Sequence, residues 1–208
     1  MPLIFAASGA VFGALADRLS ARWPSHTDGS SRSIDWRTVA VLASGLLAFA
    51  ALVMRWPEPR DQLVLGIYFA ALIVLLATDL DQKLLPDLLT LPLIGYALVV
   101  LLLGWSPLLA GKELGAISGI AAGIGAPVVL VLTNRLFGGG LGMGDVKLAV
   151  SLGLMFGISH LVAGFLLASI GSSVLLVILI AARRLSLRSP IPFGPILIAA
   201  GILAGVLP

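Results

Sequence analysis

Residues 71–81 read ALIVLLATDLD, an unbroken apolar run that ends in two aspartates separated by one leucine. A similar junction occurs at residues 138–148, which read GGGLGMGDVKL: glycines precede an aspartate, and an apolar segment follows. Each junction therefore places a carboxylate at the edge of a hydrophobic segment. Because acidic side chains at membrane depth are costly, such residues indicate a functional site by default.

The composition of the whole chain is that of a membrane protein. Hydrophobic residues make up 59% of the 208 residues, charged residues only 11%, and the mean hydropathy is +1.11. Soluble domains carry roughly 25% charged residues, so this chain could not cover a water-facing surface. We expect an all-α, polytopic integral membrane protein with a single membrane domain over residues 1–208. Its net charge of +3 then reflects membrane orientation and not nucleic-acid binding.

The hydropathy pattern predicts about eight membrane spans. A spanning helix needs about 20 mostly apolar residues. Only a weak polar break at residues 157–160 separates a short sixth segment from the seventh, so the sequence leaves open whether these are one segment or two. The predicted spans are roughly 2–19, 38–55, 62–79, 88–105, 113–134, 147–158, 160–182 and 191–207.

The basic residues predict the orientation of these spans. Ten fall on one side and three on the other, and the richer side faces the cytoplasm in most membrane proteins. We therefore expect the N-terminus outside and both acidic motifs at the cytoplasmic face. The cytoplasmic set is Arg18, Arg22, Arg32, Arg37, Lys83, Arg135, Lys147, Arg183, Arg184 and Arg188, and the opposite set is Arg55, Arg60 and Lys112.

Asp79 and Asp145 are the candidate catalytic residues. Asp79 ends an inward-running span and Asp145 opens an outward-running one, so adjacent antiparallel helices would bring both to the same depth. Two carboxylates within hydrogen-bond reach share a proton, so one can act as general base and the other as general acid. This chemistry needs no metal and no cofactor. The chain has no cysteine, and its two histidines, His26 and His160, are far apart, so we expect neither a metal site nor a cofactor site.

Glycines surround the second acid. Gly142 and Gly144 lie in a run of five glycines over seven residues, and glycine permits positive φ and a close approach of the backbone. The sequence predicts an unusual backbone beside Asp145 that could line the path of an extended peptide. Glycines also recur every fourth residue at Gly115 and Gly119 and on to Gly123, which predicts close helix packing and no catalytic role.

Three further charged residues lie near the acids. Lys147 could tune the electrostatics of the site or contact a lipid phosphate, and the sequence leaves both open. Asp81 could support the acid pair or be solvated. Asp87 follows Pro86, which favours a role as the N-cap of the fourth span.

The motifs at residues 79–87, DLDQKLLPD, and 142–148, GMGDVKL, resemble those of the bacterial type IV prepilin peptidases, which are GxGD-type aspartyl proteases of the inner membrane. The PFGP at 192–195 resembles the turn before the family's last helix. GALADRLSARWP at 13–24 resembles its N-terminal signature in a degraded form, with Ala14 and Asp17 in place of serine and asparagine. By this resemblance residues 61–208 form the peptidase core, and residues 1–60 form a degraded N-terminal part.

The resemblance implies a function and a substrate. It makes Asp79 and Asp145 the catalytic acids of a multi-pass inner-membrane protein, surrounded by membrane lipid. Its partner would be a prepilin or pseudopilin, whose basic leader is removed from an apolar helix at the cytoplasmic face. Many family members also N-methylate the new N-terminus, and those usually carry paired cysteines in a large loop between the first two spans. The corresponding loop, residues 20–37, is short and lacks cysteine, so we expect cleavage without methylation.

Two other functions fit an acid pair in a membrane protein. The acids could relay protons in a proton-coupled transporter. Alternatively, the chain could be a catalytically inactive paralogue that acts as an assembly factor. A proton relay does not require glycines one and three residues before the acid, and intact Asp79 and Asp145 argue against an inactive paralogue.

Overall fold

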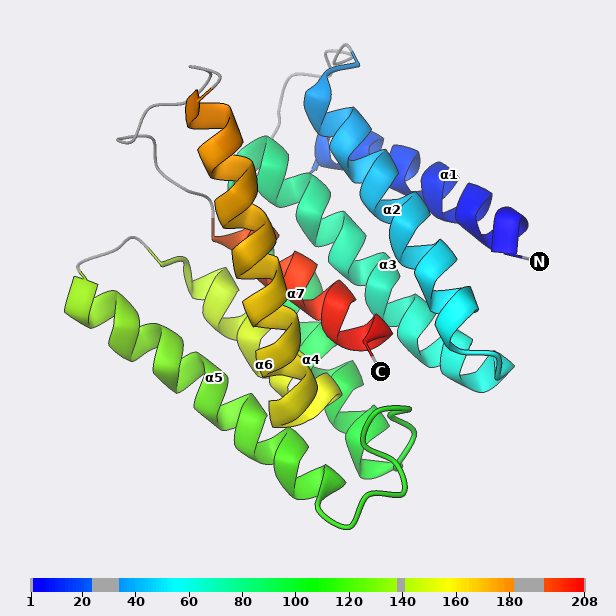
Figure 1. Cartoon of the computed structure of the whole chain (residues 1–208), viewed down its shortest axis with the longest axis vertical. Helices are drawn as coiled ribbons and strands as arrows, with labels where there is room; N and C mark the ends of the chain where they lie inside the picture. The colour runs from blue at the N-terminus through cyan, green and yellow to red at the C-terminus, as the bar shows by residue number, and fades with distance from the viewer. Residues whose placement is uncertain (1, 24–33, 138–140, 182–192, 208) are drawn as a thin grey trace.

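The fold is a bundle of α-helices (Figure 1). The computed structural model describes residues 2–23, 34–137, 141–181 and 193–207, and within them it contains seven helices and no strand. The all-α prediction is confirmed for this part of the chain. The helices are α1 (Pro2–Ser20), α2 (Trp36–Arg55), α3 (Pro59–Gln82), α4 (Asp87–Leu102), α5 (Gly115–Phe137), α6 (Met143–Ala181) and α7 (Gly194–Val206).

Four of the described helices are long and apolar enough to cross a membrane. They are α2, α3, α5 and the stretch Met143–Ile178 of α6. α4 and α7 are apolar but shorter. These lengths confirm the membrane character that the composition predicts.

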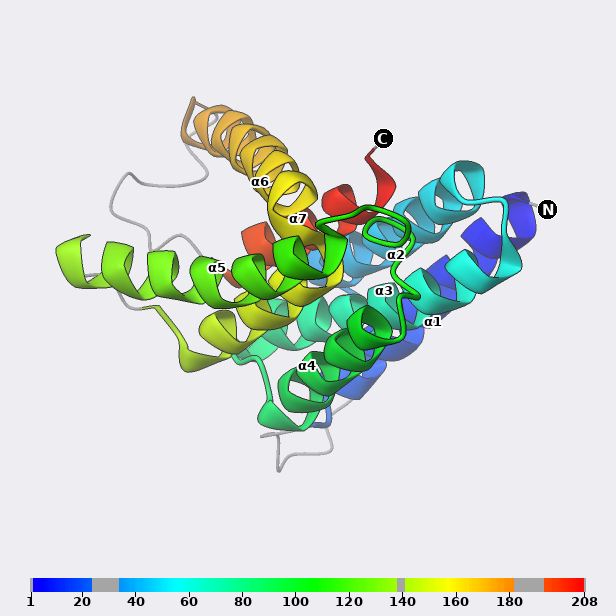
Figure 2. The same ribbon diagram turned by 90° about the horizontal axis from the view of Figure 1, so that it is seen from below.

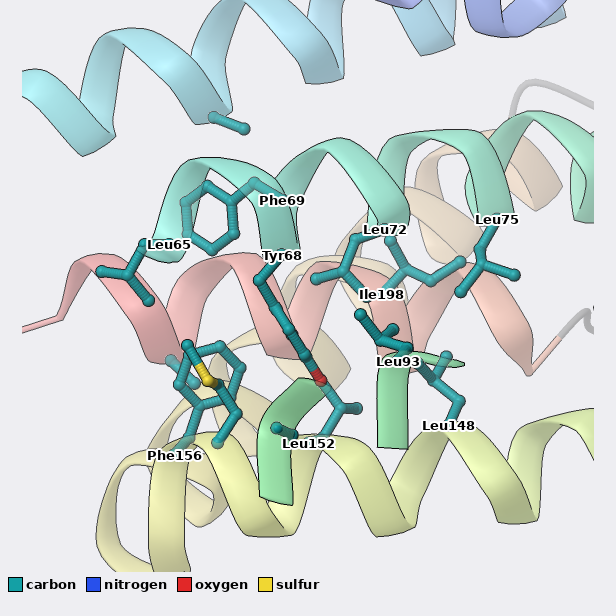
Figure 3. Close-up of a cluster of buried hydrophobic side chains, with 14 of the residues drawn as sticks. Leu65, Tyr68, Phe69, Leu72, Leu75, Leu93, Leu148, Leu152, Phe156 and Ile198 are labelled. Carbon is teal, nitrogen blue, oxygen red and sulfur yellow. The ribbon is translucent and has the colours of Figure 1, made fainter. Parts of the chain in front are cut away.

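α3 is the central helix of the bundle. In its most apolar window 56% of the residues are buried, whereas the corresponding windows of α2, α5 and α6 are 17–28% buried. Side chains from α3 meet those of α4, α6 and α7 in one core (Figure 3). Tyr68 of α3 hydrogen-bonds Ser151 of α6 at 2.9 Å between hydroxyl oxygens, and its ring packs edge-on against Phe156. The labelled core residues are Leu65, Tyr68, Phe69, Leu72, Leu75, Leu93, Leu148, Leu152, Phe156 and Ile198.

α6 bends sharply at Gly157. The φ of this residue is 69° and its ψ is −178°, a conformation that side chains disfavour and glycine tolerates. The second half of the helix then runs back toward the end of the bundle where the first half began (Figures 1 and 2). The predicted spans 147–158 and 160–182 correspond to these two halves, which the structure joins into one element.

Two serines satisfy the backbone groups that the bend frees. The Ile158 N–H donates to Ser118 Oγ at 3.0 Å, and Ser106 Oγ donates to the Met155 carbonyl at 3.0 Å. Because lipid offers no hydrogen bonds, a bend at membrane depth needs such partners within the protein. A freed backbone group on each side of Gly157 therefore has a hydrogen-bond partner within the protein.

Gly119 and Gly123 of α5 serve helix packing, as their spacing predicts, whereas a Cβ at Gly115 would meet the backbone of Leu109 in the preceding loop. A Cβ at Gly119 would lie 2.8 Å from Leu101 Cδ1, and one at Gly123 would lie 2.9 Å from Leu154 Cδ2. α5 can therefore pack closely against the first half of α6. This contact places the residues that follow α5, including Asp145, beside the core.

Candidate active site

Two buried carboxylates lie together at one end of the bundle. Asp79, near the C-terminal end of α3, is 9% exposed, and Asp145, in the first turn of α6, is 8% exposed. The two are close enough to interact electrostatically. The structure thus brings together the two acids that the sequence singles out.

Each acid has an oxygen that nothing else in the described residues satisfies. Asp79 Oδ2 and Asp145 Oδ1 are buried and have no hydrogen-bond partner there. Buried polar atoms are nearly always paired, and an exception calls for an explanation such as a catalytic role. Each carboxylate thus keeps one buried oxygen available to a ligand.

The backbone before α6 orients Asp145. The Gly142 N–H donates to Asp145 Oδ2 at 3.3 Å, so one oxygen of this carboxylate is engaged and the other is left unpaired. The Leu141 N–H donates to Asn134 Oδ1 at 3.1 Å and ties this segment to α5. Gly142 therefore contacts Asp145. Residues 138–140 of the glycine run lie outside the described residues.

The predicted unusual backbone at Gly144 is wrong. Gly144 lies in the first turn of α6, and positive φ among the described glycines is confined to Gly104, Gly111 and Gly157. Glycine is needed at this position because the backbone of Leu85 approaches it closely. A Cβ at Gly144 would lie 2.6 Å from Leu85 Cβ and 3.0 Å from the Leu85 carbonyl oxygen. Gly144 thus lets the segment between α3 and α4 pack against the start of α6.

Gly194 forms a third side of the site, which sequence reasoning missed. A Cβ at this residue would lie 2.7–2.9 Å from the Oδ2, Cγ and Oδ1 atoms of Asp79. The first turn of α7 therefore lies directly against the carboxylate. The signal for it was present in the PFGP at 192–195, but only the contact gives that turn a role in the site. Pro192 lies outside the described residues.

Lys147 pairs with Asp87. Lys147 Nζ lies 2.6 Å from Asp87 Oδ1, so the pair joins the start of α4 to the first turns of α6, two residues past Asp145. The prediction that Asp87 is an N-cap is wrong: the cap position is Pro86, which has no side-chain cap, and Asp87 is the first residue of the helix. Proline cannot offer a capping oxygen, and the ion pair uses the Asp87 carboxylate instead.

Asp81 is buried and paired, not solvated. Its side chain is 6% exposed, and its Oδ1 accepts from Arg37 Nη1 of α2 at 3.1 Å. Next to it, Gln82 Nε2 donates to the carbonyl of Ser20, the last residue of α1, at 2.6 Å and to that of Trp23, just beyond the helix, at 3.0 Å. The end of α3 that carries Asp79 is therefore anchored to both N-terminal helices.

The described residues contain no grouping suited to a metal ion. No three His, Cys, Asp or Glu side chains among them come together in a way that could hold one. Of the two histidines, His26 lies outside the described residues.

Comparison with known proteins places these motifs in a family. The profile of the type IV leader peptidase family matches residues 66–206. A prepilin leader peptidase/N-methyltransferase of Burkholderia pseudomallei (strain K96243) is 35% identical over 161 residues, which cover 77% of this chain and 51% of that protein. A protein of the same name from Aeromonas hydrophila is 35% identical over 170 residues, which cover 78% of this chain and 51% of that protein.

A more divergent relative covers more of the chain. The prepilin leader peptidase/N-methyltransferase of Dickeya chrysanthemi is 30% identical over 177 residues, covering 84% of this chain and 61% of that protein. The chain spans about half the length of the first two relatives. No solved structure matches it significantly.

Proposed function

The chain belongs to the type IV leader peptidase family, and from that premise we propose that it is a membrane aspartyl endopeptidase that removes the short leader of type IV prepilins or pseudopilins. The observation that carries the proposal is the acid pair. Asp79 and Asp145 lie buried beside each other, and each keeps one oxygen without a partner among the described residues. Structural ion pairs use up such oxygens, whereas a catalytic dyad needs them free for water and substrate.

The proposed mechanism uses the pair as general base and general acid. One carboxylate, ionised, takes a proton from a water molecule held between the acids, and the water attacks the scissile carbonyl. The other, protonated, gives its proton to the carbonyl oxygen. The same groups then protonate the departing amine and restore the starting state. No covalent intermediate forms in this scheme.

The surrounding residues would fix the positions of the two acids relative to each other. Gly142 donates to Asp145 and fixes its orientation. The Lys147–Asp87 pair fixes the start of α6 relative to α4, and Asp81, through Arg37, fixes the end of α3 relative to α2. We assign all three interactions a positioning role, because catalysis falls steeply when reacting groups move by about 1 Å.

The proposed setting is the inner membrane, with eight spans and the acids at the cytoplasmic face. The fold-back of α6 at Gly157 supports eight crossings, because it turns one element into two oppositely directed ones (Figure 1). Contacts between helix ends support two distinct faces. Arg37–Asp81 and Lys147–Asp87 join ends on the side of the acids, whereas Trp56 Nε1 donates to the Gly205 carbonyl at 2.8 Å on the other side.

We further propose that this chain cleaves without methylating. The 208 residues contain no cysteine, and the connection between α1 and α2 is confined to residues 21–35. A cofactor the size of S-adenosylmethionine needs a pocket of roughly several hundred cubic ångströms. So short a polar segment has little apolar material with which to build one.

In vitro cleavage tests the function directly. The purified protein is mixed in detergent or lipid with prepilins of its own organism, with and without S-adenosylmethionine, and the new N-termini are sequenced and weighed. Cleavage at one site with an unmodified amine is expected. Absence of cleavage would favour the proton-coupled transporter or the inactive assembly factor, and a methylated product would overturn the second proposal alone.

A further inference from the structure

An apolar groove runs beside the candidate active site. It has a volume of about 390 Å³ and lies between α5 and the second half of α6, with the first half of α6 and α7 at its base. All the residues that line it are apolar. α5 and the second half of α6 diverge from the bend at Gly157 toward the end of the bundle that carries the acids (Figures 1 and 2).

Two residues of the groove lie one helical turn from the residues of the candidate site. Ala149, which lines it, lies one helical turn, or about 6 Å, from Asp145 along α6. Leu197, also in the lining, lies one turn from Gly194, which contacts Asp79. The ring of Phe165 in the lining packs against Phe193 with centroids 6.2 Å apart. The groove therefore lies near the acids, on the elements that carry Asp145 and Gly194.

The packing of the protein itself does not account for the small residues of the groove. Gly119 and Gly123 lie on the part of α5 that packs against neighbouring helices, and a Cβ at either would meet Leu101 or Leu154. Gly125 lines the groove, and a Cβ there would meet no atom within 4 Å. The groove thus keeps open space at a glycine, next to Ala121 and Ala126 on the same helix. Small residues of this kind let a further helix approach closely.

The physics of the membrane limits what the occupant can be. A polypeptide segment in apolar surroundings must satisfy its own backbone hydrogen bonds, so it is helical. We propose that the groove between α5 and the second half of α6 holds an apolar helix of the substrate, on the membrane side of the scissile bond. This inference rests on the proposed peptidase function. In this proposal the groove recognises the substrate helix and the two acids carry out the cleavage, so the two steps can be changed separately.

A kinetic experiment separates recognition from chemistry. Gly125→Leu adds a side chain at a groove position where a Cβ meets no atom within 4 Å, and Gly95→Leu on α4 is the matched control, because a Cβ there also meets nothing within 4 Å. The substrates are a peptide with the scissile junction followed by its apolar helix, and the same peptide cut short before the helix. For the long peptide, Gly125→Leu should raise KM about tenfold, the scale of overpacking a fitted site. The short peptide and the control variant should show no change.

Two kinetic results would overturn the inference. One is an unchanged KM for the long peptide with Gly125→Leu. The other is an equal loss on both peptides, which would indicate damage to the acid site. If the wild-type protein cleaves neither peptide, the proposed function itself fails.

Cross-linking tests the location independently, because a chain without cysteine gives clean single-cysteine variants. Val129→Cys and Val162→Cys place thiols on opposite walls of the groove, and Leu47→Cys on α2 is an equally exposed apolar control away from it. Each is combined with Asp79→Asn to retain uncleaved long peptide bearing one cysteine in its helix. Disulfides from both walls and none from the control are expected. Disulfides between two copies of the protein, or none to the peptide while the wild type still cleaves it, would overturn the inference and leave the function standing.

Discussion

Gly194 lies so close to Asp79 that a single added carbon would fall 2.7 Å from the carboxylate Oδ2. These residues are far apart in the sequence, and the contact joins the first turn of the last described helix to the acid at the end of the central one. The main chain of Gly194 therefore forms part of the surface against which the carboxylate packs.

Gly194→Ala should reduce cleavage about 10²-fold, because the added methyl group displaces the Asp79 carboxylate by a distance that catalysis does not tolerate. The control is Gly205→Ala on the same helix, where a Cβ would lie 2.7 Å from Phe69 Cζ, away from the acids. Both variants are compared by melting temperature and by initial cleavage rate. Equal losses of activity would show that the effect comes from helix packing alone.

Asp79→Asn and Asp145→Asn should each lower the rate by about 10² or more, the scale of a lost general acid or base. Asparagine keeps the shape of the side chain but cannot exchange the proton. Because the two acids act as a unit, the double variant should be little worse than either single one. Rates are measured at matched expression and membrane insertion, and robust cleavage by one variant would remove that residue from the pair.

The rate should depend on pH as a bell-shaped curve. A pair that shares a proton works with one carboxylate ionised and the other protonated, and both flanks of the curve belong to the pair. Below the lower flank the base is protonated, and above the upper flank the acid has lost its proton. The same assays should be insensitive to EDTA. Inhibition by EDTA that zinc reverses would contradict a mechanism built on two carboxylates.

Gly144→Val should impair cleavage strongly, because a side chain there runs into Leu85, including its backbone carbonyl 3.0 Å away. The start of α6 would then shift together with Asp145. Gly95→Val is the matched control, since a Cβ at Gly95 has open space. Gly119→Ala, which looks mild from the sequence, is a poor control because its Cβ would lie 2.8 Å from Leu101 Cδ1. Normal cleavage by Gly144→Val would remove Gly144 from the site.

Lys147→Ala and Asp87→Ala should lower kcat by similar factors, and the double variant should lose no more than either one. Coupled residues show this non-additivity in a double-mutant cycle. Asp87 is exposed, so loss of the pair should cost stability only about 1 kcal/mol or less. Additive losses of kcat would indicate that the two residues act separately.

The sequence predicts well what depends on local pattern. The apolar runs locate the helices to within a few residues, and the acids at their ends identify Asp79 and Asp145, because burial of a carboxylate is unusual wherever it occurs. The small-residue spacing of Gly119 and Gly123 likewise reflects packing that the structure confirms. In each case the physical reason is contained in the residue and its near neighbours.

Contacts between distant segments could not be predicted in the same way. Asp87 looks like a helix cap beside Pro86, and only the fold brings Lys147, sixty residues later, to its carboxylate. Asp81 has no visible partner in its own segment, yet Arg37 reaches it from α2. The role of Gly194 depends on a tertiary contact in the same sense. Pattern identifies which residues are unusual, whereas only the fold identifies their partners.

In the proposed eight-span arrangement, the bend at Gly157 determines on which side of the membrane the chain continues to α7. The 39 residues of α6 would extend about 58 Å as a straight helix, roughly twice the thickness of a hydrocarbon core of about 30 Å. One straight crossing would carry the chain to the opposite side of the membrane and start α7 there. The fold-back adds one crossing and returns the chain to the side of the acids, where Gly194 reaches Asp79. In that proposed arrangement, a bend at one residue determines whether Gly194 and Asp79 can meet on the far side of the bundle.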